Sequence, residues 1–178
     1  NMVTILGVFG RDRSMPKLFE VANHPDIRVR KEVVKTLVRI SHPTVVPFLL
    51  KRLSQEVDDV KLLIIFSLGI IKSKEAINDL VAILQSEKNL SIKKEALIAL
   101  GRIGAKEVFP IIKDYALKKG FFKKTDTKVL RIAAINGLAD IKTKEAGELL
   151  EKLLKDSDAD VRDAAFEALQ KGKFGLGR

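Results

Sequence analysis

The sequence predicts an all-α fold, a solenoid in which helical hairpins stack along one axis. Two observations support this prediction. A segment of twelve residues, with apolar, basic and small positions in a fixed order and an ending close to Leu-Gly-x-Ile, recurs at spacings of 31, 32, 38 and 31 residues. A second amphipathic segment lies between successive copies. Two helix-length segments in a period of this size are typical of α-solenoids, because one hairpin alone cannot bury its apolar stripe.

The first helix of each hairpin is the segment that recurs. Its first positions are Val29, Val60, Ile92, Leu130 and Val161. A sixth, incomplete copy surrounds Leu6 to Gly10. Apolar residues at the first, fifth, ninth and twelfth positions fall on one helix face, which we expect in the core. Asp26, Asn89 and Asp158 stand three residues before three of the starts, where their side chains can cap the helix.

The second helix of each hairpin is expected over five segments with leucines or other apolar residues at three- and four-residue intervals. These segments are Pro16–Val21, Pro47–Leu53, Ile77–Leu84, Ile111–Leu117 and Leu149–Leu154. Three prolines, Pro16, Pro47 and Pro110, hold one repeat position, which we expect near a helix start, where a missing N–H costs little. Four hydroxyl residues mark the same starts: Ser14, Thr44, Ser73 and Thr143.

Two stretches carry a resemblance to a known family. Residues 92–104 read Ile-Lys-Lys-Glu-Ala-Leu-Ile-Ala-Leu-Gly-Arg-Ile-Gly, and residues 158–165 read Asp-Ala-Asp-Val-Arg-Asp-Ala-Ala. Both resemble the Val-Arg-x-x-Ala-x-x-Ala-Leu-Gly-x-Ile signature of short bacterial HEAT-like repeats, which bilin lyases share. The resemblance implies a right-handed α-solenoid of about five and a half hairpins. It says little about function, because such repeats have many roles.

The repeats divide a single solenoid domain into expected units at about residues 1–24, 25–56, 57–87, 88–125, 126–156 and 157–172. The longest unit holds a seven-residue insertion between Pro110 and Leu130. The first copy starts in mid-helix, and Met2 to Leu6 lack the polar face that caps the end of a complete solenoid. We therefore expect a fragment of a longer chain. The alternative is a complete chain with a shortened first helix.

Composition excludes several classes of protein. The 178 residues include no cysteine, which removes disulfide scaffolds, thiolate metal sites and cysteine nucleophiles. His24 and His42 each precede proline in a turn, without the His-Glu pairs that hold iron in HEAT-like hydroxylases. The sequence has no phosphate-binding loop, carboxylate dyad or Ser-His-Asp set, so we expect no cofactor, no metal and no catalytic residue. A HEAT-like lyase or glycosylase is the enzymatic alternative.

Hydropathy and charge limit where the protein can be located and what kind of partner it can bind. The longest uncharged apolar run, Leu62 to Ile71, is far shorter than the roughly 20 residues of a membrane-spanning helix, and no secretory signal pattern is present. We therefore expect a cytoplasmic protein without membrane insertion. The formal net charge is +10, and residues 61–124 alone hold 13 basic and 6 acidic residues. This asymmetry indicates an acidic partner near the middle of the chain, or serves solubility alone.

The candidate binding face follows from the resemblance, which implies that the first helices line the concave side. The third, seventh and eleventh positions of each copy would then face the groove. They read Lys31-Lys35-Arg39, Leu62-Phe66-Ile70, Lys94-Ile98-Arg102, Ile132-Asn136-Asp140 and Asp163-Glu167-Lys171. A helix that is apolar on all sides cannot be covered on all sides in a solenoid, so the second set predicts an exposed apolar patch, extended by Ile98 and Ile132.

The function that this face predicts is a non-enzymatic scaffold for protein–protein interaction. We expect an acidic, amphipathic helix or peptide in the groove. Its contacts would be the apolar residues Leu62, Phe66, Ile70, Ile98 and Ile132 and the basic residues Lys31, Lys35, Arg39, Lys94 and Arg102. The alternative is that a neighbouring segment covers the apolar set, or that the set packs deeper in this repeat.

The insertion predicts a different type of partner. It places aromatic residues among lysines, which can stack on bases and contact phosphates. The residues are Lys118, Lys119, Phe121, Phe122, Lys123 and Lys124. A nucleic-acid-binding helical-repeat protein that uses residues 118–128 is therefore the alternative function. The competing interpretation is a loop whose phenylalanines close the core and whose lysines are solvated.

The basic residue at the second position recurs in every complete copy. The five residues are Arg30, Lys61, Lys93, Arg131 and Arg162. In HEAT-like families this position often joins a ladder between repeats with acids such as Asp156. We therefore interpret these basic residues as structural.

Overall fold

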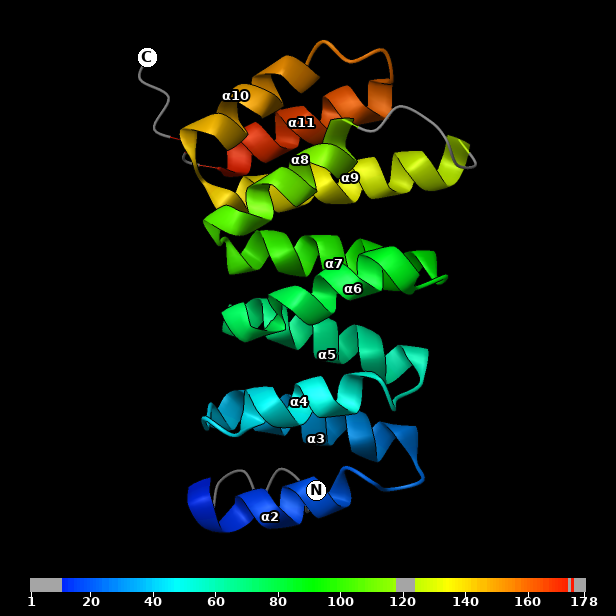
Figure 1. Ribbon diagram of the computed structural model, residues 1–178, viewed down its shortest axis with the longest axis vertical. Helices are drawn as coiled ribbons and strands as arrows, with labels where there is room; N and C mark the ends of the chain where they lie inside the picture. The colour runs from blue at the N-terminus through cyan, green and yellow to red at the C-terminus, as the bar shows by residue number, and fades with distance from the viewer. Residues whose placement is uncertain (1–10, 118–123, 173, 175–178) are drawn as a thin grey trace.

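The computed structural model describes residues 11–117, 124–172 and 174, and this part of the chain is helical and has no strand (Figure 1). Its α-helices are α2 (Arg11–Val21), α3 (Ile27–Ile40), α4 (Val45–Leu53), α5 (Asp58–Ile71), α6 (Ile77–Ser86), α7 (Leu90–Ile103), α8 (Phe109–Leu117), α9 (Lys124–Ile141), α10 (Lys144–Leu153) and α11 (Ala159–Lys171). Two 3₁₀ turns, η1 (Lys74–Ala76) and η2 (Lys106–Val108), lead into α6 and α8.

The helices form two layers that run the length of the molecule. Successive helices of the inner layer, which are α3, α5, α7, α9 and α11, pack against one another. The outer layer holds α4, α6, α8 and α10, each packed on helices of the inner layer. Figure 1 shows the hairpins stacked along the long axis, with α2 at one end and α10 and α11 at the other. The fold is therefore the α-solenoid that the repeats predict.

The core is continuous along this stack because each repeat supplies the same buried positions. Leu37, Leu68, Leu100 and Leu138 hold the ninth position of four successive inner helices, and all four are fully buried. Outer helices add leucines from the other side, such as Leu49 and Leu80. No hairpin has a core of its own, so burial of apolar surface ties each repeat to its neighbours.

The predicted acidic and amide caps are confirmed. Each side chain accepts a hydrogen bond from the backbone N–H two residues on, at 2.8 Å for Asp26, 2.9 Å for Asn89 and 3.0 Å for Asp158. Among the hydroxyl residues, Thr143 accepts from the N–H of Ala146 at 3.2 Å, whereas Thr44 and Ser73 stand at the cap position without a side-chain capping bond. In the turn before α4, the ring nitrogen Nδ1 of His42 instead contacts the hydroxyl of Thr44 at 2.8 Å and accepts from its N–H at 3.3 Å.

The expected start of the first outer helix was wrong. Ser14 and Pro16 lie inside α2, which already includes Arg11. A proline here removes one backbone hydrogen bond, to the carbonyl four residues earlier, and a single missing bond does not end the helix. In α4 and α8, by contrast, Pro47 and Pro110 lie in the first turn.

Close backbone contacts bring the inner helices together at small residues. A Cβ added to Gly101 of α7 would lie 2.3 Å from the Cα of Gly137 in α9. A Cβ added to Gly69 of α5 would lie 2.9 Å from the Cα of Ala99 in α7. Both distances are shorter than atoms can approach, so α5, α7 and α9 sit at a separation that larger side chains would not allow.

Part of the seven-residue insertion lengthens a helix. The other inner helices have 13 or 14 residues, whereas α9 has 18. Leu130 is the seventh residue of α9, while the equivalent Val29, Val60 and Ile92 are the third residues of their helices. Four of the extra residues therefore add about one turn at the amino end of α9.

The basic residues at the second repeat position form the expected ladder in the hairpins where both partners are described. The pairs are Arg30 Nε with Glu56 Oε2 at 3.0 Å, Lys61 Nζ with Glu87 Oε2 at 3.8 Å and Arg131 Nη2 with Asp156 Oδ2 at 2.6 Å. Arg162 instead donates to the carbonyls of Asp156 and Ser157. These contacts lie between the hairpins and confirm a structural role for Arg30, Lys61, Arg131 and Arg162, while the same role for Lys93 stays a prediction.

Replacing Gly101 tests the close helix contact. Alanine ordinarily stabilises a helix interior by about 1 kcal/mol relative to glycine. We expect Gly101→Ala to lower the free energy of unfolding by about 2 kcal/mol instead, because the methyl group overlaps the backbone of α9. Gly69→Ala, with its longer contact, should cost less. Urea unfolding followed by circular dichroism measures both, and a gain of stability for Gly101→Ala would contradict the contact.

Candidate functional site

The strongest candidate site lies on the inner layer. Among the described residues, four large apolar side chains are exposed to solvent: Val57, Phe66, Ile70 and Phe166. Two of them, Phe66 and Ile70, belong to the predicted groove set and lie one turn apart on α5, with 42% and 51% of their surface exposed. The other apolar residues of the set, Leu62, Ile98 and Ile132, are half-buried and pack against the core. We refer to these five residues as the apolar stripe.

The stripe has a polar contact that joins two repeats. The guanidinium of Arg102, on α7, lies over the ring of Phe66 with its central carbon 4.8 Å from the ring centroid. The same guanidinium makes an ion pair with Glu95, at 3.2 Å between Nη1 and Oε1. A cation held over an aromatic face is attracted by the ring electrons. Arg102 is therefore held at the edge of the stripe and not extended into solvent.

The basic residues of the first set are paired with acids of the protein itself. Glu32 lies 3.7 Å from Lys35 Nζ and 3.4 Å from Arg39 Nη2. Lys31 Nζ lies 2.7 Å from Asp59 Oδ2 in the next hairpin. Lys94, on α7, is exposed. The positive charge that the inner layer presents is thus smaller than the residue types alone indicate.

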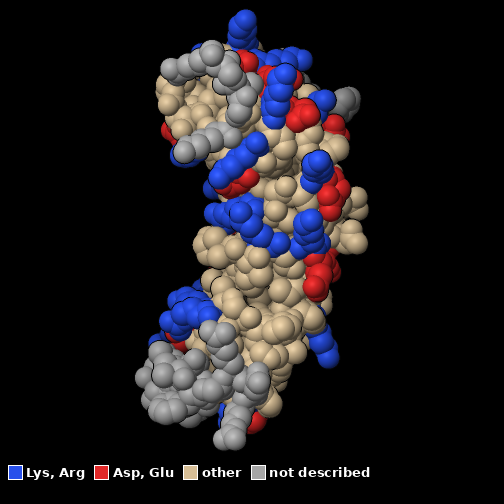
Figure 2. All heavy atoms as spheres, turned by 90° about the vertical axis from the view of Figure 1, so that its left-hand side faces the viewer, with Lys and Arg blue, Asp and Glu red and all other residues tan. Residues whose placement is uncertain are grey.

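A seven-residue spacing explains why the stripe is centred on α5. Glu32 pairs with Arg39 on α3, and Glu95 pairs with Arg102 on α7, each two turns apart on one helix face. The equivalent positions of α5 hold Leu63 and Ile70, which carry no charge. Figure 2 shows uncharged surface between groups of lysines and arginines along the edge that faces the viewer. An apolar helix is therefore flanked by two helices that carry charge pairs.

Most of the contacts predicted for the insertion lie outside the described residues. Lys118, Lys119, Phe121, Phe122 and Lys123 lie outside the described residues, as does the side chain of Lys124. Further along the segment, Lys128 Nζ binds Asp160 Oδ2 at 2.5 Å and lies 3.7 Å from Asp158 Oδ2. The hydrogen bond to Asp160 and the two negative charges raise the pKa of Lys128. Carboxylates at the amino end of α11 thus already pair with this lysine.

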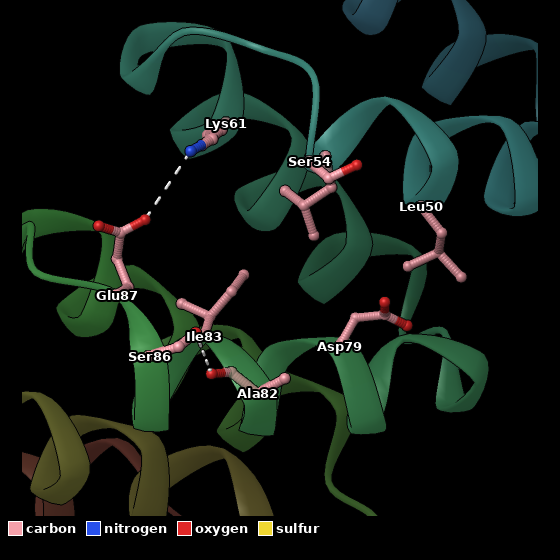
Figure 3. A pocket seen from close by; sticks show the side chains of 9 residues that line it. Leu50, Ser54, Lys61, Asp79, Ala82, Ile83, Ser86 and Glu87 are labelled. Carbon is pink, nitrogen blue, oxygen red and sulfur yellow. Dashed lines mark hydrogen bonds and ion pairs between the residues drawn. The ribbon is translucent and has the colours of Figure 1, made fainter.

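The sequence interpretation missed a second concave feature, on the outer layer. A pocket of about 250 Å³ opens between α4 and α6 (Figure 3). Its lining residues are Leu50, Leu53, Ser54, Lys61, Asp79, Ala82, Ile83, Ser86 and Glu87. The signal for it is present in the sequence, in residues 31 positions apart on successive outer helices, but it becomes visible only once contacts between those helices are known.

The described residues form neither a metal-binding cluster nor a membrane-spanning helix. No group of three or more His, Cys, Asp or Glu side chains there lies close enough to hold a metal ion. Within the same residues, no helix combines the length and the apolar character needed to cross a membrane.

Comparison with protein families identifies the repeats. A family model described as HEAT repeats matches residues 1–63, 54–122 and 116–176, which together span nearly the whole chain. No curated protein matches the sequence.

Comparison with solved structures supports the same fold. An engineered protein, solved by crystallography, is 21% identical, with a TM-score of 0.55 over 95% of this chain and 83% of its own. Human deoxyhypusine hydroxylase in complex with glycerol is 13% identical, with a TM-score of 0.54 over 97% of this chain and 99% of its own. A second engineered protein is 22% identical, with a TM-score of 0.51 over 90% of this chain and 47% of its own. At these identities the likeness concerns the fold.

A charge placed on the stripe tests whether its residues are surface or core. We expect Phe66→Asp to change the free energy of unfolding by less than about 1 kcal/mol, because the side chain is exposed and the new carboxylate lies beside Arg102. Ile64→Asp, two residues earlier on the same helix, should unfold the protein, because Ile64 is fully buried. Thermal unfolding of both variants measures the difference. Equal destabilisation would place Phe66 in the core.

Proposed function

The chain belongs to the HEAT-repeat family, whose solenoids generally serve as scaffolds for protein interaction, and on this premise we propose that it is a non-enzymatic scaffold that binds a partner protein along its inner layer. The observation that carries this proposal is the exposure of Phe66 and Ile70 in the middle of the stack. Burying a phenylalanine and an isoleucine normally stabilises a protein by about 1.5–3 kcal/mol each, so their exposure is most simply explained by a partner that covers them.

The chemistry around the stripe indicates the character of that partner. A central aromatic residue next to an arginine is the usual composition of an interaction hot spot. Lys35 and Arg39, both exposed, are each paired with Glu32 at the protein surface, and such pairs are worth about 1 kcal/mol or less. Carboxylates of a partner can therefore replace Glu32 at little cost. An amphipathic helix with apolar residues on one face and acidic residues at its edges fits this surface.

The two alternatives have less support. A nucleic-acid-binding function would draw on residues 118–128, of which the described Lys128 is engaged with Asp158 and Asp160. An enzymatic function has a parallel in human deoxyhypusine hydroxylase, which shares the fold at 13% identity. This chain has only two histidines, His24 and His42. Each lies in a turn between helices and contacts a residue of that turn: His24 accepts from the N–H of Asp26, and His42 contacts Thr44.

The proposal is tested by capturing partners from nuclease-treated lysate of the source cells. We expect the unaltered protein to retain a partner whose capture falls at least about tenfold with the double variant Leu62→Asp, Phe66→Asp, since hot-spot residues each contribute about 1.4 kcal/mol or more. Cross-linking followed by mass spectrometry should place an acidic segment of that partner against α5 and α7.

The control is Phe166→Asp, which replaces an exposed aromatic residue with aspartate as Phe66→Asp does, but on α11, three helices along the inner layer from α5. Capture that survives this substitution but fails with the double variant locates the interface on α5. Capture that survives both substitutions would refute the proposed groove. Capture that disappears with nuclease, or that falls steeply with added salt, would instead support nucleic acid as the partner.

A further inference from the structure

The pocket on the outer layer lies between α4 and α6. In the neighbouring repeats, a polar side chain bridges the two equivalent helices. Leu50 and Leu53 of α4 form one wall, and Asp79 and Ile83 of α6 form the other. Figure 3 shows Ile83 and Asp79 rising from α6 toward Ser54 and Leu50, with Lys61 and Glu87 at one side. Comparison with the equivalent space in the neighbouring repeats shows which side chain is missing between α4 and α6.

In the preceding repeat, an arginine fills this space between α2 and α4. Arg52 donates from Nη2 to the carbonyl of Ala22 at 2.8 Å and from Nη1 to Asn23 Oδ1 at 2.6 Å. Its Nη2 also pairs with Glu56, which Arg30 contacts from the other side. The guanidinium thus satisfies a carbonyl, a side-chain oxygen and a carboxylate from one position.

A shift of 31 residues moves this arrangement onto the pocket. The acceptors Ala22, Asn23 and Glu56 become Leu53, Ser54 and Glu87, and the second cation Arg30 becomes Lys61. All four replacements line the pocket. The donor Arg52 becomes Ile83, whose side chain has no N–H group. The acceptors of an arginine site are therefore retained, while the chain supplies no arginine for it.

The following repeat is bridged as well. Tyr115 of α8 holds the position equivalent to Arg52, and its hydroxyl donates to the carbonyl of Leu84 on α6 at 3.3 Å. In the repeats on both sides of the pocket, a polar side chain of one outer helix thus donates to a carbonyl at the end of the preceding outer helix. The two carbonyls, of Ala22 and Leu84, hold equivalent repeat positions.

A second replacement widens the pocket. Between α2 and α4 the rings of Phe19 and Phe48 stack with their centroids 4.1 Å apart. Thirty-one residues later these positions hold Leu50 and Asp79, which are smaller, and Asp79 adds a carboxylate. The space between α4 and α6 is therefore larger, and more acidic at its rim, than the space that Arg52 fills.

The charge of the pocket favours a cation. Glu87 accepts backbone N–H bonds from Asn89 at 3.0 Å and Lys88 at 2.7 Å, and these bonds lower the pKa of its carboxyl, so Glu87 is ionised at neutral pH. Lys61 lies 3.8 Å from Glu87, a longer contact than the 3.0 Å between Arg30 and Glu56. Among the residues that line the pocket, the carboxylates of Glu87 and Asp79 outnumber the single ammonium group of Lys61, while the charge of Lys93, outside the lining, also acts on Glu87.

From this equivalence we propose that the pocket between α4 and α6 binds an arginine side chain of a partner protein. The methylene groups of the arginine lie against Leu50 and Ile83, and its guanidinium donates to Glu87, the Leu53 carbonyl and Ser54. The planar fork of a guanidinium matches a carboxylate and a carbonyl together, which the ammonium of lysine does not. This site is on the layer opposite to the apolar stripe and does not depend on the function proposed for that stripe.

A short capped peptide tests the site directly. The probe is acetyl-Gly-Arg-Gly-amide, and the matched control replaces arginine with citrulline, which has the same shape and no charge. We expect the arginine peptide to shift the backbone amide resonances of residues 50–54 and 79–87 with a dissociation constant on the order of 1 mM. The citrulline peptide should bind at least about tenfold more weakly. Equal shifts with both peptides, or no shift with either, would overturn the proposal.

Filling the site from within the chain is the second test. Ile83→Arg places a guanidinium four residues before Glu87, the spacing of Arg52 and Glu56. We expect this variant to lose the peptide-induced shifts and to raise the midpoint of thermal unfolding, whereas Ile83→Leu, which keeps the size and polarity, should bind the peptide as before. Glu87→Gln should weaken binding at least about tenfold with the fold intact. An Ile83→Arg variant that still binds the peptide at the same resonances would refute the assignment.

Discussion

The separation of the inner helices is the constraint on which the rest of the molecule depends. Gly101 contacts Gly137, and Gly69 contacts Ala99, at distances that leave no room for a side chain at position 69 or 101. Helices α5, α7 and α9 are therefore drawn together, whereas side chains span the space between successive outer helices. Arg52 and Tyr115 span it in two repeats. Between α4 and α6, Ile83 leaves a pocket.

The fold could be predicted from the sequence because its determinants repeat. Apolar positions every three or four residues and side chains such as Asp26 and Asn89 at the helix starts act locally, within one helix or one turn. The start of α2 could not be predicted, since Pro16 is tolerated inside that helix. The extra turn of α9 was also missed, because the residues around Lys124 carry no strong helix or loop signal.

The candidate site was predictable in position and less so in charge. Exposure of Phe66 and Ile70 follows from helix periodicity, because a helix with apolar residues on every side must present some of them to solvent. The pairing of Arg39 with Glu32 depends on side-chain conformation, and the pairing of Lys31 with Asp59 depends on how two hairpins dock. A residue count gives the net charge of a surface region, but it does not show which charges are already neutralised by their neighbours.

The missing bridge at Ile83 also bears on the mechanics of the molecule. Between α3 and α5, Val38 and Ser67 hold the positions that Gly69 and Ala99 hold between α5 and α7. The close glycine contact is therefore absent between α3 and α5 as well. A stack of hairpins under load behaves as a series of springs, in which the softest spring takes up most of the extension. Bending of the solenoid should therefore concentrate between the hairpin of α3 and α4 and that of α5 and α6, and so change the curvature beside Phe66.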